Sequence, residues 1–490
     1  MKEGIVIGSG FSGLSAAAFL AEKGIKMTVI EKNNQIGGRA RKIESQGYCF
    51  DMGPSWYWMH DIFENFFNHF NRSSNEFYKL KKLDPGFKII FDSEEIAIPA
   101  NFKETCKLFK RYEIQGDKKL LKFMRDAEKK YKIGLSFLYK SPGLSLTEFF
   151  KTNLICNLGN LTLLSSYRKH IKKYFKHPLL IHILEFPVLF LGATADKMPA
   201  LYSLMSYSGI KDGTFYPIGG FHEIIKGMKN ICDQKGVKFL KNEEVTKINI
   251  KNRKAYSITT INQTINTDFV VASADYAHIE SCLLEKEFRN YNEKYWKRKK
   301  FSPSALIFYL GINTKLKNLE HHNLFFDEDV EKNSADIYIH KRWNKNPLFY
   351  VCCPSKTDIK VAPIGKENIF ILMPISAGIK DNNKIREKYF EIIIDKLEKY
   401  TNCNIKEHIE YKKSYCINDF QNDYNAYKGN AYGLANTLDQ TANLKPKIIN
   451  KKIKNLFYTG QLTVPGPGVP PSIISGQIVS EHIIKNLKKI

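Results

Sequence analysis

The sequence predicts an α/β fold in which a Rossmann-like dinucleotide-binding domain is interleaved with a mixed α+β substrate domain. Three observations predict it. A βαβ pattern with a glycine-rich turn opens the chain, a strand, a Gly/Pro-rich loop and a helix close it, and the chain is 490 residues long. A chain of this length is too long to fold around one ordinary hydrophobic core, so we expect two or more cooperating domains. Because the two nucleotide-fold segments lie at opposite ends, we expect the domains to be discontinuous.

The N-terminal segment predicts the first βαβ unit. Residues 4–7 have the composition of a short buried strand, residues 13–24 carry apolar side chains at helical spacing, and residues 27–30 form a second strand that ends at Glu31. A unit of this kind opens a parallel sheet, because the helix crosses over between two strands that run in the same direction.

A glycine turn joins the first strand to the first helix. Gly8 permits the tight turn, Gly10 lets the backbone approach a pyrophosphate, and Gly13 lets helix and strand pack closely. The free N–H groups at the helix N-terminus attract the anion. The carboxylate of Glu31 ends the second strand, where it would accept hydrogen bonds from ribose hydroxyls. We therefore predict a dinucleotide site here.

A second glycine pair indicates which dinucleotide is bound. Gly37 and Gly38 precede Arg39, whose fixed charge and forked geometry suit a second contact with the phosphates. A Rossmann domain that binds only NAD does not need this second clamp, so the pattern favours FAD. The alternative is a surface turn with a solvated arginine.

The remaining pattern divides the chain into three parts. We assign residues 1–75, 201–280 and 445–490 to a discontinuous FAD-binding domain, because strands alternate with helices there. Residues 76–200 carry longer amphipathic segments and are expected to form a helical region. Residues 281–444 contain several β-rich runs and are expected to form a substrate-binding domain.

Composition limits the partners. A hydrophobic fraction of 43% and an aromatic fraction of 13% exclude a disordered chain. The formal net charge of +25 accompanies many Lys, Asn and Ile residues, a pattern typical of an A/T-rich genome. No nucleic-acid-binding module is recognisable, so we expect no nucleic-acid partner. Attraction to an anionic membrane surface stays open.

Cysteine and histidine usage predicts no metal site. The nine cysteines are odd in number and form no CxxC pair, so we expect free thiols in a reducing compartment. Neighbouring residues of a strand face opposite ways, so we interpret His321 and His322 as a surface or loop pair. The chain enters a strand almost at once and has no long apolar run without charge. We therefore expect no signal peptide, no membrane span, and a cytoplasmic location.

Further along the chain, the motifs resemble a known family, the bacterial-type phytoene desaturases of the FAD-dependent, amine-oxidase-like superfamily, whose FAD domain is of the glutathione-reductase type. The resemblance covers essentially the whole length, and its C-terminal motif is similar to that of desaturases from carotenoid-making flavobacteria. The segments that carry it are Gly8–Gly13, Glu31–Asn33, Gly37–Ala40, Phe50–Ser55, Tyr216–Phe221, Ala272–Asp275, Asn425–Ala431, Tyr458–Gln461 and Pro465–Pro470.

The resemblance implies a set of contacts with FAD. The residues expected at the pyrophosphate are Ser9, Gly10, Gly38 and Arg39. Glu31 is expected at the adenosine ribose, and the backbone of Val245 at the adenine. The residues expected beside the flavin ring are Gly53, Pro54, Ser55, Gly460, Val469 and Pro470. The loop before the last helix would aim a helix N-terminus at the pyrimidine end of the flavin and favour its reduced anion.

The activity implied is the FAD-dependent dehydrogenation of a C40 carotenoid precursor, phytoene towards lycopene, with quinone or oxygen as electron acceptor. The cation left by hydride loss is delocalised over the polyene, so a strong base is not obligatory. Some family members carry an acid and an arginine before a Phe-Ser-Phe-type motif. No such pair is evident in the comparable stretch, residues 177–187. We therefore carry over no catalytic acid or base.

An insoluble polyene has to be taken from a membrane, so we expect the protein at the inner face of the cell membrane. Residues 161–191 combine basic side chains with an apolar run. That pattern is typical of a monotopic membrane surface, or equally of a core helix beside a solvated basic face.

Several other functions share these motifs. The enzyme alternatives are another carotenoid desaturase acting later in the pathway, a carotenoid isomerase and a retinol-saturase-like enzyme. A different class is a non-enzymatic prenyl-lipid escort similar to GDP-dissociation inhibitors, which needs no flavin. An NAD-only dehydrogenase would likewise lack bound flavin.

Overall fold

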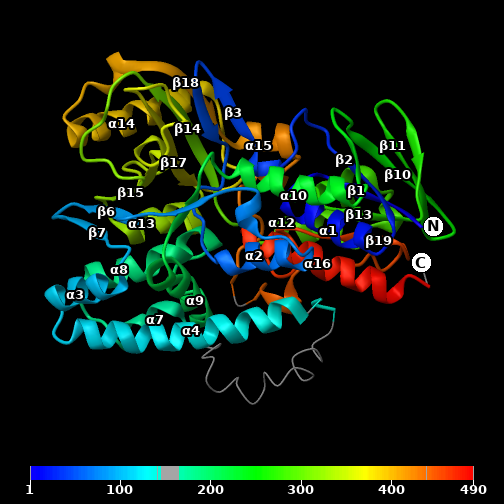
Figure 1. Cartoon of the computed structure of the whole chain (residues 1–490), viewed down its shortest axis with the longest axis horizontal. Coiled ribbons are helices and arrows are strands. Elements are labelled where there is room, and N and C mark those ends of the chain that lie inside the picture. The colour runs from blue at the N-terminus through cyan, green and yellow to red at the C-terminus, as the bar shows by residue number, and fades with distance from the viewer. Residues whose placement is uncertain (1, 141, 145–164, 438, 489–490) are drawn as a thin grey trace.

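Two main β-sheets and a helical layer make up the protein (Figure 1). The computed structural model describes residues 2–140, 142–144, 165–437 and 439–488. The parallel sheet lies near the two chain termini, and the larger sheet lies at the other end of the molecule (Figure 1). The predicted α/β class is confirmed.

The first sheet is five-stranded and parallel, as the βαβ pattern predicts. From one edge to the other, its strands are β19 (Leu456–Tyr458), β13 (Phe269–Ala272), β1 (Glu3–Ile7), β2 (Lys26–Ile30) and β9 (Lys238–Leu240). The strand that begins the chain's last βα unit, β19, therefore lies two places from β1. The nucleotide-fold segments from both ends of the sequence form one sheet.

Three helices pack against this sheet: α1 (Phe11–Glu22), α10 (His222–Gln234) and α16 (Val469–Asn486). Helices α1 and α16 lie side by side, and a Cβ atom on Gly476 would meet the Ser12 carbonyl oxygen at 2.5 Å. Helix α16 begins at Val469, within the Gly/Pro-rich segment Pro465–Pro470. Its first turn accepts Pro470 and Pro471, because backbone N–H groups there need no intrahelical partner.

The second sheet is seven-stranded and mixed. Its strands, in spatial order, are β18 (Ile409–Tyr415), β14 (Ser304–Ile312), β17 (Glu367–Ile375), β16 (Phe349–Cys352), β15 (His322–Phe326), β6 (Phe87–Phe91) and β7 (Glu95–Ile98). Helix α14 (Asn383–Thr401) buries Phe390 and Ile393 against it.

The last two strands, β6 and β7, lie within residues 76–200, which were expected to form a helical region. The run Phe87–Phe91 is completely buried, and it pairs in parallel with β15. Tertiary pairing with a distant strand therefore decides its conformation. The division of the chain into domains stays a prediction.

The helical layer follows these strands. Its helices are α3 (Phe102–Tyr112), α4 (Gly116–Lys140), α7 (Tyr167–Lys172), α8 (Pro178–Glu185) and α9 (Ser203–Ser206). In α8, Leu180, Ile183 and Leu184 have no exposed surface, so between residues 165 and 189 the apolar run is core beside a basic face. Residues 161–164 of that predicted segment lie outside the described residues. Within the described ranges, no helix is long and apolar enough to cross a membrane.

Shorter elements complete the fold. The remaining strands are β3 (Lys42–Ser45), β4 (Tyr48–Asp51), β5 (Leu80–Lys82), β8 (Phe215–Pro217), β10 (Val245–Lys251), β11 (Lys254–Thr260) and β12 (Thr264–Asn266). The remaining α-helices are α2 (His60–His69), α11 (Tyr276–His278), α12 (Glu293–Arg298), α13 (Val330–Ala335) and α15 (Ile417–Tyr424).

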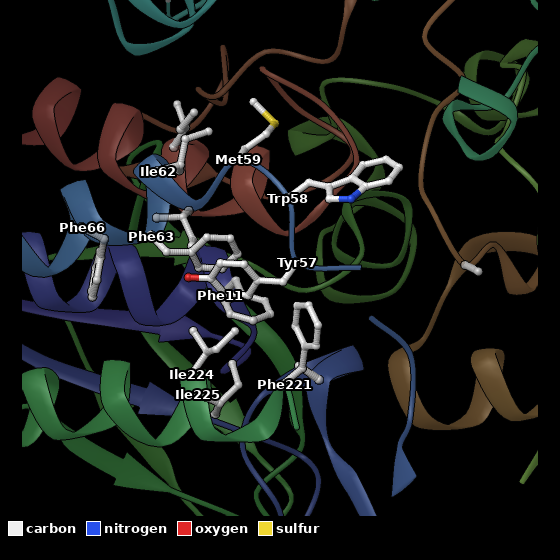
Figure 2. Close-up of a cluster of buried hydrophobic side chains, with 14 of the residues drawn as sticks. Phe11, Tyr57, Trp58, Met59, Ile62, Phe63, Phe66, Phe221, Ile224 and Ile225 are labelled. Atoms are coloured by element: carbon white, nitrogen blue, oxygen red, sulfur yellow. The ribbon is translucent and has the colours of Figure 1, made fainter. Parts of the chain in front are cut away.

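An aromatic core fixes the segment that leads into α2. Tyr57 stacks on Phe63 with ring centroids 4.3 Å apart, and Phe11 and Phe221 lie close by (Figure 2). The Tyr57 hydroxyl is satisfied by a 2.9 Å hydrogen bond with the hydroxyl of Tyr78. Because a buried aromatic cluster of this kind permits little movement, the backbone just before it is held rigidly. That backbone, residues 53–59, forms one wall of the site.

Candidate functional site

One large cavity of about 730 Å³ runs between the parallel sheet, the seven-stranded sheet and the helical layer. All the predicted cofactor residues except Gly13 line it. Gly13 instead sits where helix and strand touch, since a Cβ there would lie 2.1 Å from the Gly8 carbonyl oxygen. The structure thus brings the predicted residues together, while their individual contacts with FAD stay predictions.

The glycine turn shapes the nucleotide end of the cavity. Gly8 has φ of +100°, which the tight turn after β1 requires. Gly10 is the N-cap of α1, and a Cβ on it would meet no atom within 4 Å, so its backbone faces open space. A phosphate can therefore approach the helix N-terminus closely.

Glu31 is buried at the end of β2, and its carboxylate is fully hydrogen-bonded. One oxygen accepts from the backbone N–H and the hydroxyl of Ser9, at 3.0 and 2.6 Å. The other accepts from the backbone N–H and the side-chain amide of Asn33, at 3.0 and 2.9 Å. A ribose hydroxyl would replace the Ser9 hydroxyl or the Asn33 amide, both of which are rotatable groups.

An unpaired hydrogen-bond donor on Arg39 shows whether the site fits FAD. Its guanidinium donates from Nη2 to the Asn430 carbonyl at 3.0 Å and lies 5.0 Å over the ring of Tyr424, but its buried Nε has no partner among the described residues. Burial lowers the pKa of Arg39 from its ordinary value. A buried donor that is left unpaired costs free energy. A pyrophosphate in the neighbouring glycine cradle would satisfy this donor, so the residues fit the dinucleotide.

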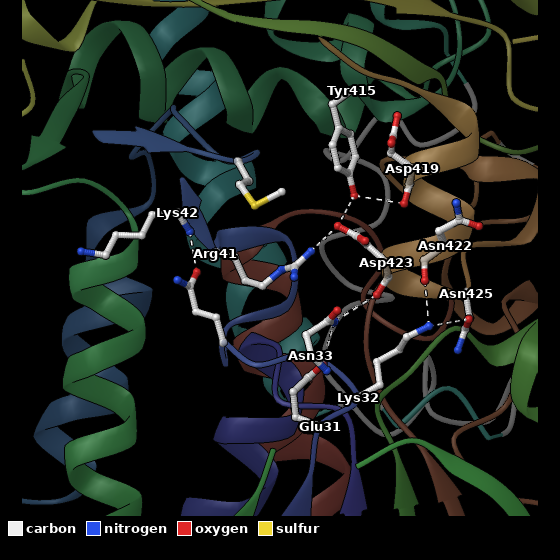
Figure 3. Close-up of polar contacts among 12 residues, drawn as sticks. Glu31, Lys32, Asn33, Arg41, Lys42, Tyr415, Asp419, Asn422, Asp423 and Asn425 are labelled. Carbon is white, nitrogen blue, oxygen red and sulfur yellow. Dashed lines mark hydrogen bonds and ion pairs between the residues drawn. The ribbon is translucent and has the colours of Figure 1, made fainter. Parts of the chain in front are cut away.

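Helix α15 lies beside the end of β2, at the predicted adenosine side of the cavity (Figure 3). Lys32 donates to the Asn422 carbonyl at 2.7 Å, and the Asn33 amide donates to the Asp423 carbonyl at 3.1 Å. The Asp423 carboxylate also forms an ion pair with Arg41. This clamp could not be predicted from the sequence, because its two halves lie about 390 residues apart and neither matches a local motif.

Three elements meet at the predicted flavin-ring end. The Met52 carbonyl just before Gly53 accepts a 2.7 Å hydrogen bond from the hydroxyl of Tyr309 in β14, and the Tyr350 hydroxyl in β16 donates to the Ser55 hydroxyl at 3.0 Å. The N-terminus of α16, beginning at Val469, opens onto the same cavity. The positive ends of α1 and α16 therefore both face it, which favours negative charge on a bound group.

Beyond the nucleotide end, the cavity continues into an apolar half. Its lining side chains include Trp56, Trp58, Met59, Ile133, Leu191, Leu201, Leu204, Met205, Ile307, Leu372 and Leu444. The acidic and basic residues of the described lining all group with the nucleotide half: Glu31, Lys32, Arg39, Glu243, Glu244, Asp275, His278 and Asp423. The apolar half suits a long hydrocarbon and excludes water.

An acid–arginine pair is present where the sequence analysis found none evident. Glu185, at the end of α8, accepts two hydrogen bonds from Arg168 at 2.5 and 2.7 Å. The arginine lies on α7, outside residues 177–187, so the local sequence pattern could not reveal it. Neither residue lines the cavity.

Two further sets of buried polar atoms were not anticipated. His321 is only 4% exposed and His322 is completely buried, so the expected surface position of this pair is wrong. The buried Lys445 amino group and the side-chain oxygen Oδ1 of Asn436 lie near Gly466, and neither has a hydrogen-bond partner among the described residues. Burial lowers the pKa of Lys445 to about 7.

A nucleotide cradle built from both chain ends, opening on an apolar cavity, defines an FAD-dependent oxidoreductase. The chain belongs to the family of flavin-containing amine oxidoreductases, whose model matches residues 11–484. Its relatives place it among the carotenoid desaturases of that family. This membership supports an FAD-dependent oxidoreductase rather than a non-enzymatic escort or an NAD-only dehydrogenase.

The relatives are similar over their full length. A carotenoid 3,4-desaturase from Haloarcula japonica is 36% identical over 98% of this chain and 98% of its own. A 4,4'-diapophytoene desaturase (4,4'-diaponeurosporene-forming) from Staphylococcus aureus is 28% identical over 99% of both chains. Among solved structures, an oxidoreductase from Methanosarcina mazei matches 98% of this chain and 100% of its own, with a TM-score of 0.63 and 18% identity, which shows the shared fold.

Proposed function

We propose that this carotenoid desaturase introduces a double bond at the 3,4 position of a carotenoid. The observation that carries the reaction class is the single cavity that joins the nucleotide cradle to an apolar half. The position is proposed from the relative of 36% identity, which is named as a 3,4-desaturase. A second candidate is the dehydrogenation of phytoene towards lycopene, which the 28% identical diapophytoene desaturase supports.

Different residues of the cavity would bind FAD and orient the substrate. FAD, when bound, supplies the acceptor for the hydride that the substrate loses. The segment Gly53–Ser55 and the N-terminus of α16 form two walls at the junction of the cavity's two halves. Trp56 and Trp58 continue the first wall into the apolar half and exclude water from the reacting segment.

Proton loss from the substrate needs no strong base in this cavity. The described lining of the apolar half carries no carboxylate, imidazole or amine. The cation left after hydride loss is spread over the polyene, which makes the neighbouring C–H bond acidic enough for weak acceptors. We infer that orientation rather than general base catalysis supplies most of the rate acceleration.

Expression in two hosts tests the proposal, one that accumulates lycopene and one that accumulates only phytoene, which is colourless. In a host that accumulates lycopene, a 3,4-desaturase converts lycopene into a product lighter by two hydrogen atoms, with a longer chromophore. In a host that accumulates only phytoene, the second candidate produces coloured polyenes. A product of unchanged mass in either host would indicate an isomerase and contradict both proposals.

We also propose that the protein works at the inner face of the cell membrane. The support is the insolubility of a polyene and the formal net charge of +25, which favours anionic lipid. Vesicles that contain phosphatidylglycerol should carry the purified protein down on centrifugation at low salt, and vesicles of phosphatidylcholine should not. Equal binding to both, or to neither, would contradict it.

The electron acceptor is proposed to be quinone or oxygen. Reduced holoprotein, mixed anaerobically with a soluble quinone or with air-saturated buffer, should recover its oxidised flavin absorbance with one of them. Slow recovery with both would contradict the proposal.

A further inference from the structure

Behind the wall formed by residues 53–56 lies a buried cluster of three side chains with metal-ligating atoms. His322 begins β15, and its cross-strand partner in β16 is Cys352. His321 precedes the strand, and its ring centroid lies 4.5 Å from that of His322. One ligating atom from each of the three residues lies within 4.8 Å of the others. Because His321 lies outside the strand, the alternation that would separate two strand neighbours does not apply.

The hydrogen bonds of the two imidazoles leave one nitrogen of each ring free. His322 Nδ1 is 2.6 Å from the Tyr350 hydroxyl, and His321 Nδ1 is 2.7 Å from the Thr357 hydroxyl. The Nε2 atom of each ring is buried and has no partner among the described residues. This is the arrangement of metal-binding histidines, in which the second nitrogen is held by an outer hydrogen bond that fixes the ring.

Aromatic side chains hold the two buried rings in place. Trp56 stacks on His322 with ring centroids 4.0 Å apart, and the Tyr216 ring lies 4.7 Å from that of His321. Two unpaired imidazole nitrogens in an apolar interior cost free energy that a shared ligand would recover.

We propose that His321, His322 and Cys352 bind one thiophilic metal ion, Cu⁺ or Zn²⁺. Two imidazole nitrogens and one thiolate match the ligand preference of both ions. Cys352 loses its proton when the ion binds, so each ion releases one proton to solvent. With Cu⁺ the complex is neutral. With Zn²⁺ one positive charge remains, and the Asp51 carboxylate, which acts electrostatically on Cys352, offsets part of it.

The Tyr350 hydroxyl connects the proposed metal site to the wall of the cofactor cavity. Tyr350 bonds His322 on one side and Ser55 on the other, and Ser55 lines the predicted flavin-ring end. An ion bound to His322 would therefore fix the wall of the cavity without contacting the substrate. This role is structural support of the wall, and it is distinct from the desaturation itself.

Metal analysis of the full-length, flavin-containing protein tests the proposal. The protein is stripped with a chelator, incubated with excess Zn²⁺ or with Cu⁺ under reducing conditions, desalted and analysed for metal. We expect about one ion per chain for at least one metal. Cys352→Ser and His322→Gln should each lower the retained metal at least fivefold. Cys353→Ser is the matched control, because that buried neighbour contacts Ser355 and is outside the cluster.

X-ray absorption of the loaded protein gives an independent result. We expect one sulfur at about 2.3 Å and two nitrogens near 2.0 Å for zinc. Flavin absorbance and circular dichroism show whether each variant is folded. Retention of neither ion by the folded wild-type protein, a signal without sulfur, or equal retention by Cys352→Ser would overturn the proposal.

Discussion

The hydroxyl of Ser15 in α1 donates a 2.8 Å hydrogen bond to the carbonyl of Ile473 in α16, across 458 residues of sequence. Ser480 makes a second such bond, to the Ala16 carbonyl at 3.2 Å. The N-termini of both helices open onto the cofactor cavity, so these contacts set the distance between the glycine turn and the loop that leads into α16. The two ends of the chain thus form the nucleotide site only as a packed pair.

Gly476→Val tests this pairing. The glycine lies where the two helices touch, and the first added carbon would already be 2.6 Å from the Ser15 side chain. We expect a loss of about 1–3 kcal/mol in the free energy of unfolding and a large loss of bound flavin, measured by denaturation and by flavin absorbance. Gln477→Ala, whose amide bonds Glu481 on the same helix, should retain flavin. Full flavin content in Gly476→Val would contradict the account.

Arg39→Gln tests the pyrophosphate clamp. The substitution removes a buried charge whose Nε has no protein partner among the described residues, so the dinucleotide should lose a charge-assisted hydrogen bond. We expect flavin affinity to fall by about tenfold to a hundredfold, measured by reconstituting flavin-free protein. Arg39→Lys keeps the charge without the forked geometry, so its flavin affinity should lie between those of the wild type and Arg39→Gln. An unchanged affinity in Arg39→Gln would show that Arg39 does not contact the cofactor.

Lys445→Met tests the cost of an unpaired buried amine. The folded pKa of Lys445 is lowered from 10.5 to about 7, so between these values the unfolded chain binds a proton that the folded chain does not. The stability of the wild-type protein should therefore rise as the pH increases from 7 towards 10.

In Lys445→Met this slope should disappear, with a gain of roughly 2–4 kcal/mol at pH 7 that shrinks as the pH rises. Denaturation of the flavin-loaded protein between pH 7 and about pH 10 measures this free energy of unfolding. Lys451→Met, at an exposed position nearby, should behave as wild type. A less stable Lys445→Met protein would instead indicate that the amine binds the cofactor or substrate.

Short-range sequence patterns locate the residues predicted to bind the nucleotide, whereas much of the remaining structure depends on contacts between distant segments. The turn at Gly8, the acid at Glu31 and the strand before Gly460 are determined by short-range pattern, and the structure places all three at one cavity. The strand Phe87–Phe91 lies in the region expected to be helical, and its conformation depends on pairing with β15, which local sequence does not show. The clamp between Lys32 and α15, and the partner of Glu185, join distant segments in the same way.

Burial was the other quantity that the sequence could not provide. His321 and His322 have the sequence context of a loop, yet stacking on Trp56 and pairing with β16 place them in the interior. The apolar run in α8 has the composition of a membrane-facing segment as well as that of core, and only the packing of Leu180 and Ile183 distinguishes the two.

The most direct measurement is the absorbance spectrum of the purified protein before and after anaerobic addition of lycopene dispersed in vesicles. We predict the two visible bands of bound oxidised flavin, which bleach as a polyene with a longer chromophore forms. A colourless protein that neither takes up added FAD nor alters the polyene would contradict the central claim, that both ends of the chain hold one flavin beside an apolar substrate cavity.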